Sequence, residues 1–301
     1  MVNGIINVYK EPGYTSHDVI ARMRGILKQK KIGHTGTLDP QAKGVLPVCL
    51  GNATKVSDIL TNESKTYEVV GLLGVVTDTQ DIFGEIIEKN EVKIQKIQLI
   101  EVIESFVGEY EQTPPMYSAK KVNGKKLYEL AREGIVIERK SRKVFINNIE
   151  IQDINLATNE IKLSVNCSKG TYIRTLIHDI GQILDCGACM KDLLRKRVGD
   201  FTLASSKTLS QIEDIMKNKQ VDDILIKVDS LFTEYMKVIV KEQYSKIIYN
   251  GNALLPSNLK DFSLDLAKEE KIRVYDFQNN FLAIYRYDLE KEIFKPFKMF
   301  L

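Results

Sequence analysis

The chain has 301 residues, of which 44% are hydrophobic, and its formal net charge is +3. This length and composition can fill a large core, so we expect one large domain or two. No apolar run reaches about 18 residues, and the first residues lack the pattern of a signal peptide, so we expect a cytoplasmic protein without a membrane span. The 4 cysteines are too few for a disulfide scaffold. The C-x-x-C spacing at 186–189 ends a predicted helix and lacks a second ligand pair, so we interpret it as incidental thiols.

The first predicted elements are a short strand over residues 3–9, a turn and a helix. Ser16 can cap this helix, with Asp18 in its first turn. Apolar residues then recur on one face at helical spacing, namely Val19, Ile20, Met23, Ile26 and Leu27. The pattern predicts an amphipathic helix whose basic residues mostly face solvent or a ligand.

A stretch rich in glycine and threonine, GHTGTLDPQAKGVLPVCLG, occupies residues 33–51. It is not a Walker A loop, because Lys43 precedes Gly44 and no hydroxyl residue follows, and its glycines do not fit the dinucleotide pattern G-x-G-x-x-G. Asp39 stands before a proline, which restricts its backbone to extended conformations. Nothing nearby offers a metal cage. The residues alone leave three roles open for Asp39: a base, a nucleophile or a structural hydrogen-bond acceptor.

Two elements and a basic segment follow. Residues 67–76 are rich in β-branched side chains and predict a buried strand that ends in a polar turn, and residues 93–106 predict a helix. The segment 119–143 contains nine Lys or Arg and three Glu, which leaves a charge of +6. Such a segment favours a docked polyanion, although a basic run is also typical of solvated surface. We expect a helix near 126–132 and mobility in the absence of a partner.

Apolar and polar residues alternate over 161–167, which predicts a half-buried strand. Thr171 can cap the next helix, and Tyr172 and Arg174 then lie in its first turn. Active-site groups often collect at such strand-to-helix junctions.

Residues 236–301 are β-rich, with a hairpin predicted over 272–287 that turns at Gln278-Asn279-Asn280. We therefore expect a domain boundary near Thr233.

A series of stretches along residues 5–200 resembles the motifs of the TruB-type tRNA pseudouridine synthases. The stretches are YTS at 14–16, GHTGTLDPQAKGVLPVCLGNATK at 33–55, KTYEV at 65–69, QTPPMYSAK at 112–120, CSKGTYIRTL at 167–176 and LLRKRVG at 193–199. The C-terminal portion resembles, more loosely, the PUA domain that bacterial members often carry.

The resemblance implies an α+β fold. A mixed, largely antiparallel sheet flanked by helices would form a catalytic domain over residues 1–233, with 119–143 as a basic excursion that contacts RNA. Residues 234–301 would form a small β-barrel-like PUA domain. The implied activity is isomerisation of uridine-55 in the TΨC loop of tRNA. The C1′–N1 glycosidic bond breaks, the uracil rotates and C5 joins C1′, without a cofactor or metal. The T-arm of tRNA is then the expected partner, with no obligatory protein partner and a monomeric chain.

The resemblance also implies catalytic roles for three residues. Asp39 is the essential carboxylate, and Arg174 is its partner, although an ordinary phosphate contact is the alternative for this arginine. Tyr67 stacks on the uracil and is the candidate for handling the C5 proton. Whether Asp39 attacks C1′ or removes the 2′ proton stays open.

Base-binding roles are implied for His34, which would hold the extruded nucleotide, and for Tyr172 and Leu193, which would line the pocket. From the residues alone, each of these types is more often structural. The implied phosphate contacts, as a group, are Lys10, Lys120, Lys125, Arg132, Arg142 and Lys169.

Two departures from the family pattern and two rival functions stand beside this interpretation. Glu11 intervenes between Lys10 and Pro12, and Asn279, Asn280 and Tyr285 occupy places where glycines are common. One rival is an idle RNA-binding or tRNA-folding protein, which would not need the three catalytic residues. The other is a guide-RNA-dependent synthase in a larger complex, against which the basic excursion favours independent action.

Overall fold

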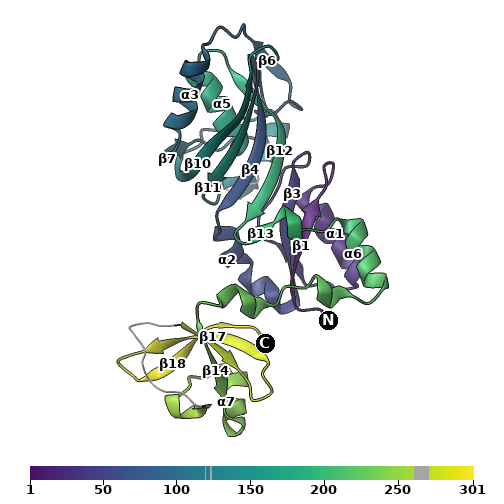
Figure 1. Cartoon of the computed structure of the whole chain (residues 1–301), viewed down its shortest axis with the longest axis vertical. Helices are drawn as coiled ribbons and strands as arrows, with labels where there is room; N and C mark the ends of the chain where they lie inside the picture. Colours follow the sequence, from purple (N-terminus) through teal and green to yellow (C-terminus); the bar gives the residue numbers. More distant parts are fainter. Residues whose placement is uncertain (119, 123, 261–270) are drawn as a thin grey trace.

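A computed structural model describes residues 1–118, 120–122, 124–260 and 271–301 (Figure 1). Its largest unit is a 9-stranded sheet whose main path has the order β1-β3-β12-β4-β11-β10-β7, with β2 paired to β3 and β13 to β12. The strands are β1 (Gly4–Lys10), β2 (Ile32–His34), β3 (Lys43–Leu50), β4 (Lys65–Leu73), β7 (Gly108–Gln112), β10 (Arg142–Asn155), β11 (Glu160–Cys167), β12 (Ala188–Val198) and β13 (Phe201–Thr202). Among the strand pairs described for this sheet, β3–β12 is parallel and the others are antiparallel, which confirms a mixed, largely antiparallel sheet.

The strand predicted over 67–76 is divided in two. β4 ends at Leu73, and Gly74 then adopts a φ of 85°, which residues with a side chain rarely adopt. A Cβ at this position would lie 2.8 Å from the carbonyl oxygen of Asn90. The chain therefore leaves the large sheet and forms a separate hairpin of β5 (Val75–Thr77) and β6 (Ile86–Lys89).

Helices cover two parts of the sheet (Figure 1). The helices are α1 (Ser16–Leu27), α2 (Ser57–Asn62), α3 (Lys96–Ser105), α4 (Leu127–Arg132), α5 (Ile173–Ile183), α6 (Leu209–Lys217) and α7 (Ser245–Tyr249). α3 and α5 share one core with β4, β10 and β11, in which Leu99 and Ile177 are fully buried. α1 and α6 share another core with β1 and β3. None of the described helices is long and apolar enough to cross a membrane.

Both predicted helix caps are displaced by one residue. Thr15, rather than Ser16, caps α1: its side chain accepts from the backbone N–H of Asp18, whose carboxylate accepts from the Thr15 N–H. Ser16 instead bonds to the backbone of Leu38. The capping position of α5 is Tyr172, not Thr171, and its backbone N–H and C=O bond to the side chain of Gln112. α1 therefore keeps a local cap, one residue earlier than predicted, whereas at α5 the distant Gln112 bonds to the capping position.

The basic excursion contains a short hairpin, β8 (Lys121–Val122) and β9 (Lys125–Lys126), followed by α4, which confirms the helix predicted there. Met116, Leu127 and Leu130 form a small buried cluster of their own. The mobility expected for this segment stays a prediction.

A second sheet, of 5 strands, occupies the lower end of the molecule in Figure 1. Its order is β15-β14-β16-β17-β18, from β14 (Met236–Val240), β15 (Leu259–Lys260), β16 (Lys271–Tyr275), β17 (Phe281–Asp288) and β18 (Ile293–Met299). The predicted hairpin is confirmed as β16–β17, with Asn279 at a φ of 68° in its turn. Closure into the expected barrel is not found among the strands described in this region. Phe300 packs beside Ile5 and Val45 of the first sheet.

The four cysteines are free and buried. Cys186 follows the end of α5, as predicted, and Cys189 lies in β12. Their burial agrees with incidental thiols.

Candidate active site

Asp39 lies on the loop between β2 and β3, and the neighbouring Leu38 fixes this loop in the core. Leu38 is buried in the cluster that also contains Tyr67 and Leu193. The Leu38 N–H donates to Ser16 Oγ at 2.9 Å, and that hydroxyl bonds to the Leu38 carbonyl at 3.3 Å. The loop therefore has a buried residue and two hydrogen bonds directly before the carboxylate.

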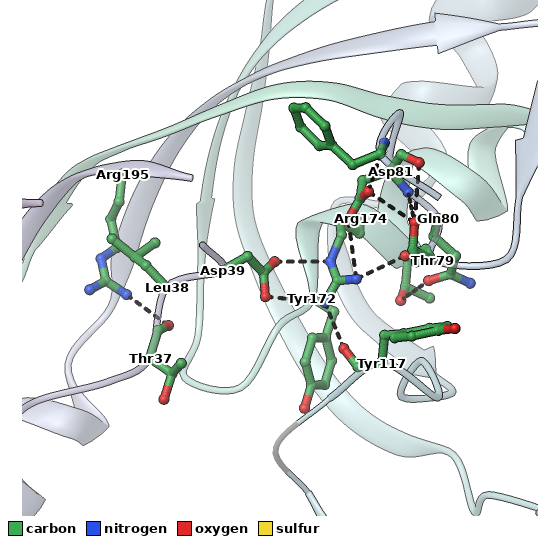
Figure 2. Close-up of polar contacts among 12 residues, drawn as sticks. Thr37, Leu38, Asp39, Thr79, Gln80, Asp81, Tyr117, Tyr172, Arg174 and Arg195 are labelled. Carbon is green, nitrogen blue, oxygen red and sulfur yellow. Dashed lines mark hydrogen bonds and ion pairs between the residues drawn. The ribbon is translucent and has the colours of Figure 1, made fainter. Parts of the chain in front are cut away.

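Asp39 and Arg174 form a bidentate ion pair (Figure 2). Arg174 Nε lies 2.9 Å from Asp39 Oδ2, and Nη2 lies 3.2 Å from Oδ1. The Arg174 side chain is 5% exposed, whereas that of Asp39 is 38% exposed. A carboxylate gripped from behind by a planar guanidinium thus keeps an open side toward a ligand.

Arg174 is itself held from two other segments. Its Nη1 donates to the carbonyl of Thr79 at 2.8 Å and lies 3.4 Å from Asp81 Oδ2, and its Nη2 donates to the carbonyl of Tyr117 at 2.9 Å. α5, the β5–β6 turn and the segment before the basic excursion therefore meet at one side chain, as Figure 2 shows.

The pKa of Asp39 is raised above its ordinary value, chiefly because burial disfavours the charged carboxylate. The nearby Asp81 also raises this pKa, whereas the positive charges of Arg174 and Lys10 lower it. Asp39 therefore has an accessible carboxylate whose pKa depends on the positive charges of Arg174 and Lys10.

Asp81 was not singled out in the sequence analysis, which assigned residues 78–84 only to a polar turn. Its Oδ1 accepts from Thr79 Oγ1 at 2.9 Å and from the Phe83 N–H at 3.1 Å, while Oδ2 faces Arg174. The only signal for it in the sequence is a dense polar stretch, TDTQD, directly after a buried strand.

Tyr67 and Leu193 lie on adjacent strands, β4 and β12, and both are less than 10% exposed, Tyr67 at 7% and Leu193 at 6%. They share the core cluster of Leu38, so the structure brings them beside the Asp39 loop. Burial raises the pKa of the Tyr67 hydroxyl, which therefore stays protonated at neutral pH.

Tyr172 and His34 are half-buried. The guanidinium of Arg142 lies over the Tyr172 ring, 5.0 Å from its centroid, and also donates to the Gly170 carbonyl. His34 Nδ1 accepts from the Gly36 N–H at 3.2 Å, and burial lowers the pKa of the imidazole, which favours its neutral form.

Lys10 does not lie where a phosphate contact requires it. It is fully buried, and its Nζ donates to the carbonyls of Glu11 at 3.1 Å, Pro40 at 2.9 Å and Ala42 at 2.6 Å. Burial also lowers its pKa to about 8. Because these three acceptors use its donors, the structure favours a role for Lys10 in holding the chain after Asp39, and speaks against the expected phosphate contact.

The other expected phosphate contacts are more accessible. Lys125, Arg132 and Lys169 are exposed, and Lys120 and Arg142 are half-buried. Lys125 lies 3.8 Å from a Glu133 carboxylate oxygen. Arg132 lies over Tyr128, and Lys169 donates to Asn62 at 2.7 Å.

Family models match most of the chain. Residues 24–173 match the TruB family pseudouridylate synthase (N terminal domain), and residues 174–233 match the tRNA pseudouridylate synthase B C-terminal domain. A tRNA pseudouridine synthase B of Lachnoclostridium phytofermentans is 52% identical, and one of Clostridium kluyveri is 43% identical, each over 100% of both chains.

Solved structures show the same fold. A Cbf5-Nop10-Gar1 complex contains a chain that is 27% identical, with a TM-score of 0.71 over 99% of this chain and 85% of that chain. An H/ACA RNP bound to a substrate RNA containing 2′-deoxyuridine contains another, with a TM-score of 0.70 at 24% identity over 99% and 85% of the two chains. From its match to the family models and from its full-length relatives, the chain belongs to the TruB family of pseudouridylate synthases.

Proposed function

We propose that this chain isomerises uridine-55 in the TΨC loop of tRNA to pseudouridine, acting alone as a cytoplasmic monomer. The observation that carries the proposal is the bidentate Asp39–Arg174 pair, whose carboxylate is accessible on one side. Relatives that are 43% to 52% identical over their full length bear the name tRNA pseudouridine synthase B, which supports tRNA as the substrate.

Asp39 serves the reaction as an ionised carboxylate. The C1′–N1 bond breaks, the uracil rotates and C5 bonds to C1′, while the C5 proton is lost to solvent and N1 takes up a proton. Asp39 either attacks C1′ or removes the 2′ proton, and both roles require the deprotonated form. Arg174 supports that form, because its charge lowers the Asp39 pKa that burial raises.

The side chains beside Asp39 would bind the extruded base. Tyr67 stacks on the uracil and is the candidate for the C5 proton, which its hydroxyl can accept only after giving up its own. Leu193 and Tyr172 form the apolar walls. His34, whose pKa is lowered so that its neutral form is favoured, helps to hold the extruded base out of the RNA loop.

The accessible basic side chains would contact the RNA backbone as a group. They are Lys120, Lys125, Arg132, Arg142 and Lys169. Recognition of the T-arm would then rest on shape and on splayed bases, as is usual for folded RNA. We assign the sheet of residues 236–299 to a PUA-like domain.

The test is tritium release from a T-arm stem-loop that carries [5-³H]uridine at the target position. The purified chain should release tritium, and Asp39→Asn, which keeps the size of the side chain, should lower the rate by about 10⁴-fold while it still binds RNA. A stem-loop labelled only at a uridine in the stem is the matched control. Release by Asp39→Asn at the wild-type rate would contradict the role of Asp39.

The same experiment separates the guide-RNA-dependent rival from independent action. Release from the bare stem-loop favours independent action. Binding without release from either protein would contradict the proposed function.

A further inference from the structure

Arg195, on β12, is a buried cation with an unusual set of partners. It is 1% exposed. Within the described chain no carboxylate lies within ion-pairing distance of its guanidinium. Instead it donates to three backbone carbonyls: Nε to Val45 at 2.7 Å, Nη2 to Gly36 at 3.2 Å and Nη1 to Thr37 at 3.4 Å. A charge buried without a countercharge opposes folding, so packing alone does not account for an arginine here.

The three acceptors lie at both ends of the loop that carries Asp39. Gly36 and Thr37 immediately precede Leu38 and Asp39, and Val45 lies in β3 after the loop. Figure 2 shows the guanidinium reaching the Thr37 carbonyl, on the side of the loop away from Arg174. One planar group therefore fixes the start of the loop to the strand at its end.

Arg195 also lies directly opposite Tyr67, because the two residues pair across β12 and β4. Its charge lowers the pKa of Tyr67, against the larger effect of burial. It lowers the pKa of His34 as well. The charge of Arg195 thus acts on Tyr67 and His34, and its hydrogen bonds hold the loop that carries Asp39.

We propose that Arg195 is a positioning residue: its fork of hydrogen bonds holds the Asp39 loop so that the carboxylate faces Arg174 and Tyr67. In this proposal Arg195 acts through the Asp39 loop and not by contact with the substrate. Lys10 bonds the chain after Asp39, through Pro40 and Ala42, and Arg195 bonds the chain before it. The inference rests on the proposed function and adds a residue that determines the rate of its chemical step.

The test compares Arg195→Met and Arg195→Lys with Arg197→Met. Arg197 is a matched control on the same strand. It also makes three hydrogen bonds, to Gly199, Ser64 and Thr66, but none to the Asp39 loop. Tritium release is measured in single turnover with enzyme in excess over the stem-loop, and RNA Kd and thermal unfolding are measured in parallel.

Both Arg195 variants should lower the single-turnover rate by about 100-fold, the loss typical of a reacting group misplaced by about 1 Å. The Kd for RNA should change little. The acid limb of the rate profile should also move to higher pH, because a carboxylate less firmly held against Arg174 gains proton affinity. Asp81 and Lys10, the other charged groups that act on Asp39, are unchanged in these variants. Arg197→Met should leave both the rate and the acid limb in place.

Wild-type rates in the Arg195 variants would overturn the inference. So would a full return of the rate in Arg195→Lys, because lysine keeps the charge but lacks the fork. If Arg195→Met does not fold, Arg195→Lys decides by the same criteria. A wild-type chain that releases no tritium contradicts the proposed function, and this inference falls with it. If the wild type releases tritium and the Arg195 variants release it at the same rate, this inference is contradicted and the proposed function is not.

Discussion

The loop around Asp39 and the basic segment at 119–143 differ in how the protein holds them. The loop is bonded through its main chain to Ser16, Lys10 and Arg195, all of which are buried. The segment exposes Lys125 and Arg132 to solvent around a small cluster of three buried apolar residues. This difference suits two tasks, because catalysis requires fixed geometry, whereas attraction of a polyanion requires accessible charge.

The largest effect expected from this comparison follows removal of the Arg174 guanidinium. Arg174→Gln should lower the single-turnover rate by at least about 10³-fold, because the carboxylates of Asp39 and Asp81 then face each other without a countercharge. Arg174→Lys should recover only part of the loss, since an ammonium cannot replace the bidentate contact. Tritium release measures both variants, with Arg286→Gln, at an exposed position of β17, as control. A rate in Arg174→Gln close to that of the wild type would show that the pair is not catalytic.

A smaller effect is expected from Asp81→Asn, about tenfold in rate, or about 1.4 kcal/mol in activation free energy. Asp81 raises the pKa of Asp39, so its removal should lower that pKa. Because the deprotonated carboxylate is the active form, the acid limb of the rate profile should move to lower pH. The measurement is single-turnover release across the acid range, and an unmoved limb would show that the two carboxylates are not coupled.

The basic segment should respond in binding rather than in chemistry. Lys125→Gln combined with Arg132→Gln should weaken RNA binding several-fold at low salt, and the slope of log K against log salt should fall by about 0.7 per contact removed. Fluorescence anisotropy at several salt concentrations gives both quantities. Lys93→Gln, an exposed change outside the segment, is the control. Equal salt slopes in the variant and in the wild type would remove this segment from the RNA interface.

The smallest effect concerns a surface ion pair outside both regions. Lys298 Nζ lies 2.7 Å from Asp58 Oδ1, and the Asp58 side chain is 69% exposed. Lys298→Met should lower the free energy of unfolding by under about 1 kcal/mol at neutral pH and low salt. Lys298 lowers the pKa of Asp58, so this stabilisation is present above the unfolded value of 3.8 and is lost as pH falls through the lower folded value. Urea unfolding at neutral and acid pH measures the difference, and a loss that persists in acid would assign it to packing.

The elements that sequence alone located are those with strong local patterns. The alternation of residues 161–167 predicted β11, and the helical periodicity after Ser16 predicted α1. The cap of α5 was misplaced because its partner, Gln112, lies far along the chain, whereas that of α1 was misplaced by one residue within a local capping box of Thr15 and Asp18. The strand predicted to end at residue 76 ends at Leu73, because Gly74 turns the chain away from the sheet.

For the site, the family resemblance predicted that Arg174 pairs with Asp39, and the structure places the two side chains in contact. Lys10 was assigned to RNA as one of a group of basic residues implied by the family resemblance, whereas three carbonyls surround its ammonium group. Asp81 and Arg195 were missed for a related reason. Their roles depend on contacts with residues that are distant in the sequence, and the spacing of residues along the chain does not reveal such contacts.

The acceptors that hold the two buried arginines have a consequence for sequence variation. Arg174 and Arg195 bond to the main-chain carbonyls of Thr79, Tyr117, Gly36, Thr37 and Val45. Every amino acid supplies a carbonyl, so these hydrogen bonds do not depend on which side chain the acceptor residue carries, except that Gly36, at a φ of 140°, favours glycine. The side chains at the other four positions can therefore vary while the hydrogen bonds that hold Arg174 and Arg195 are kept.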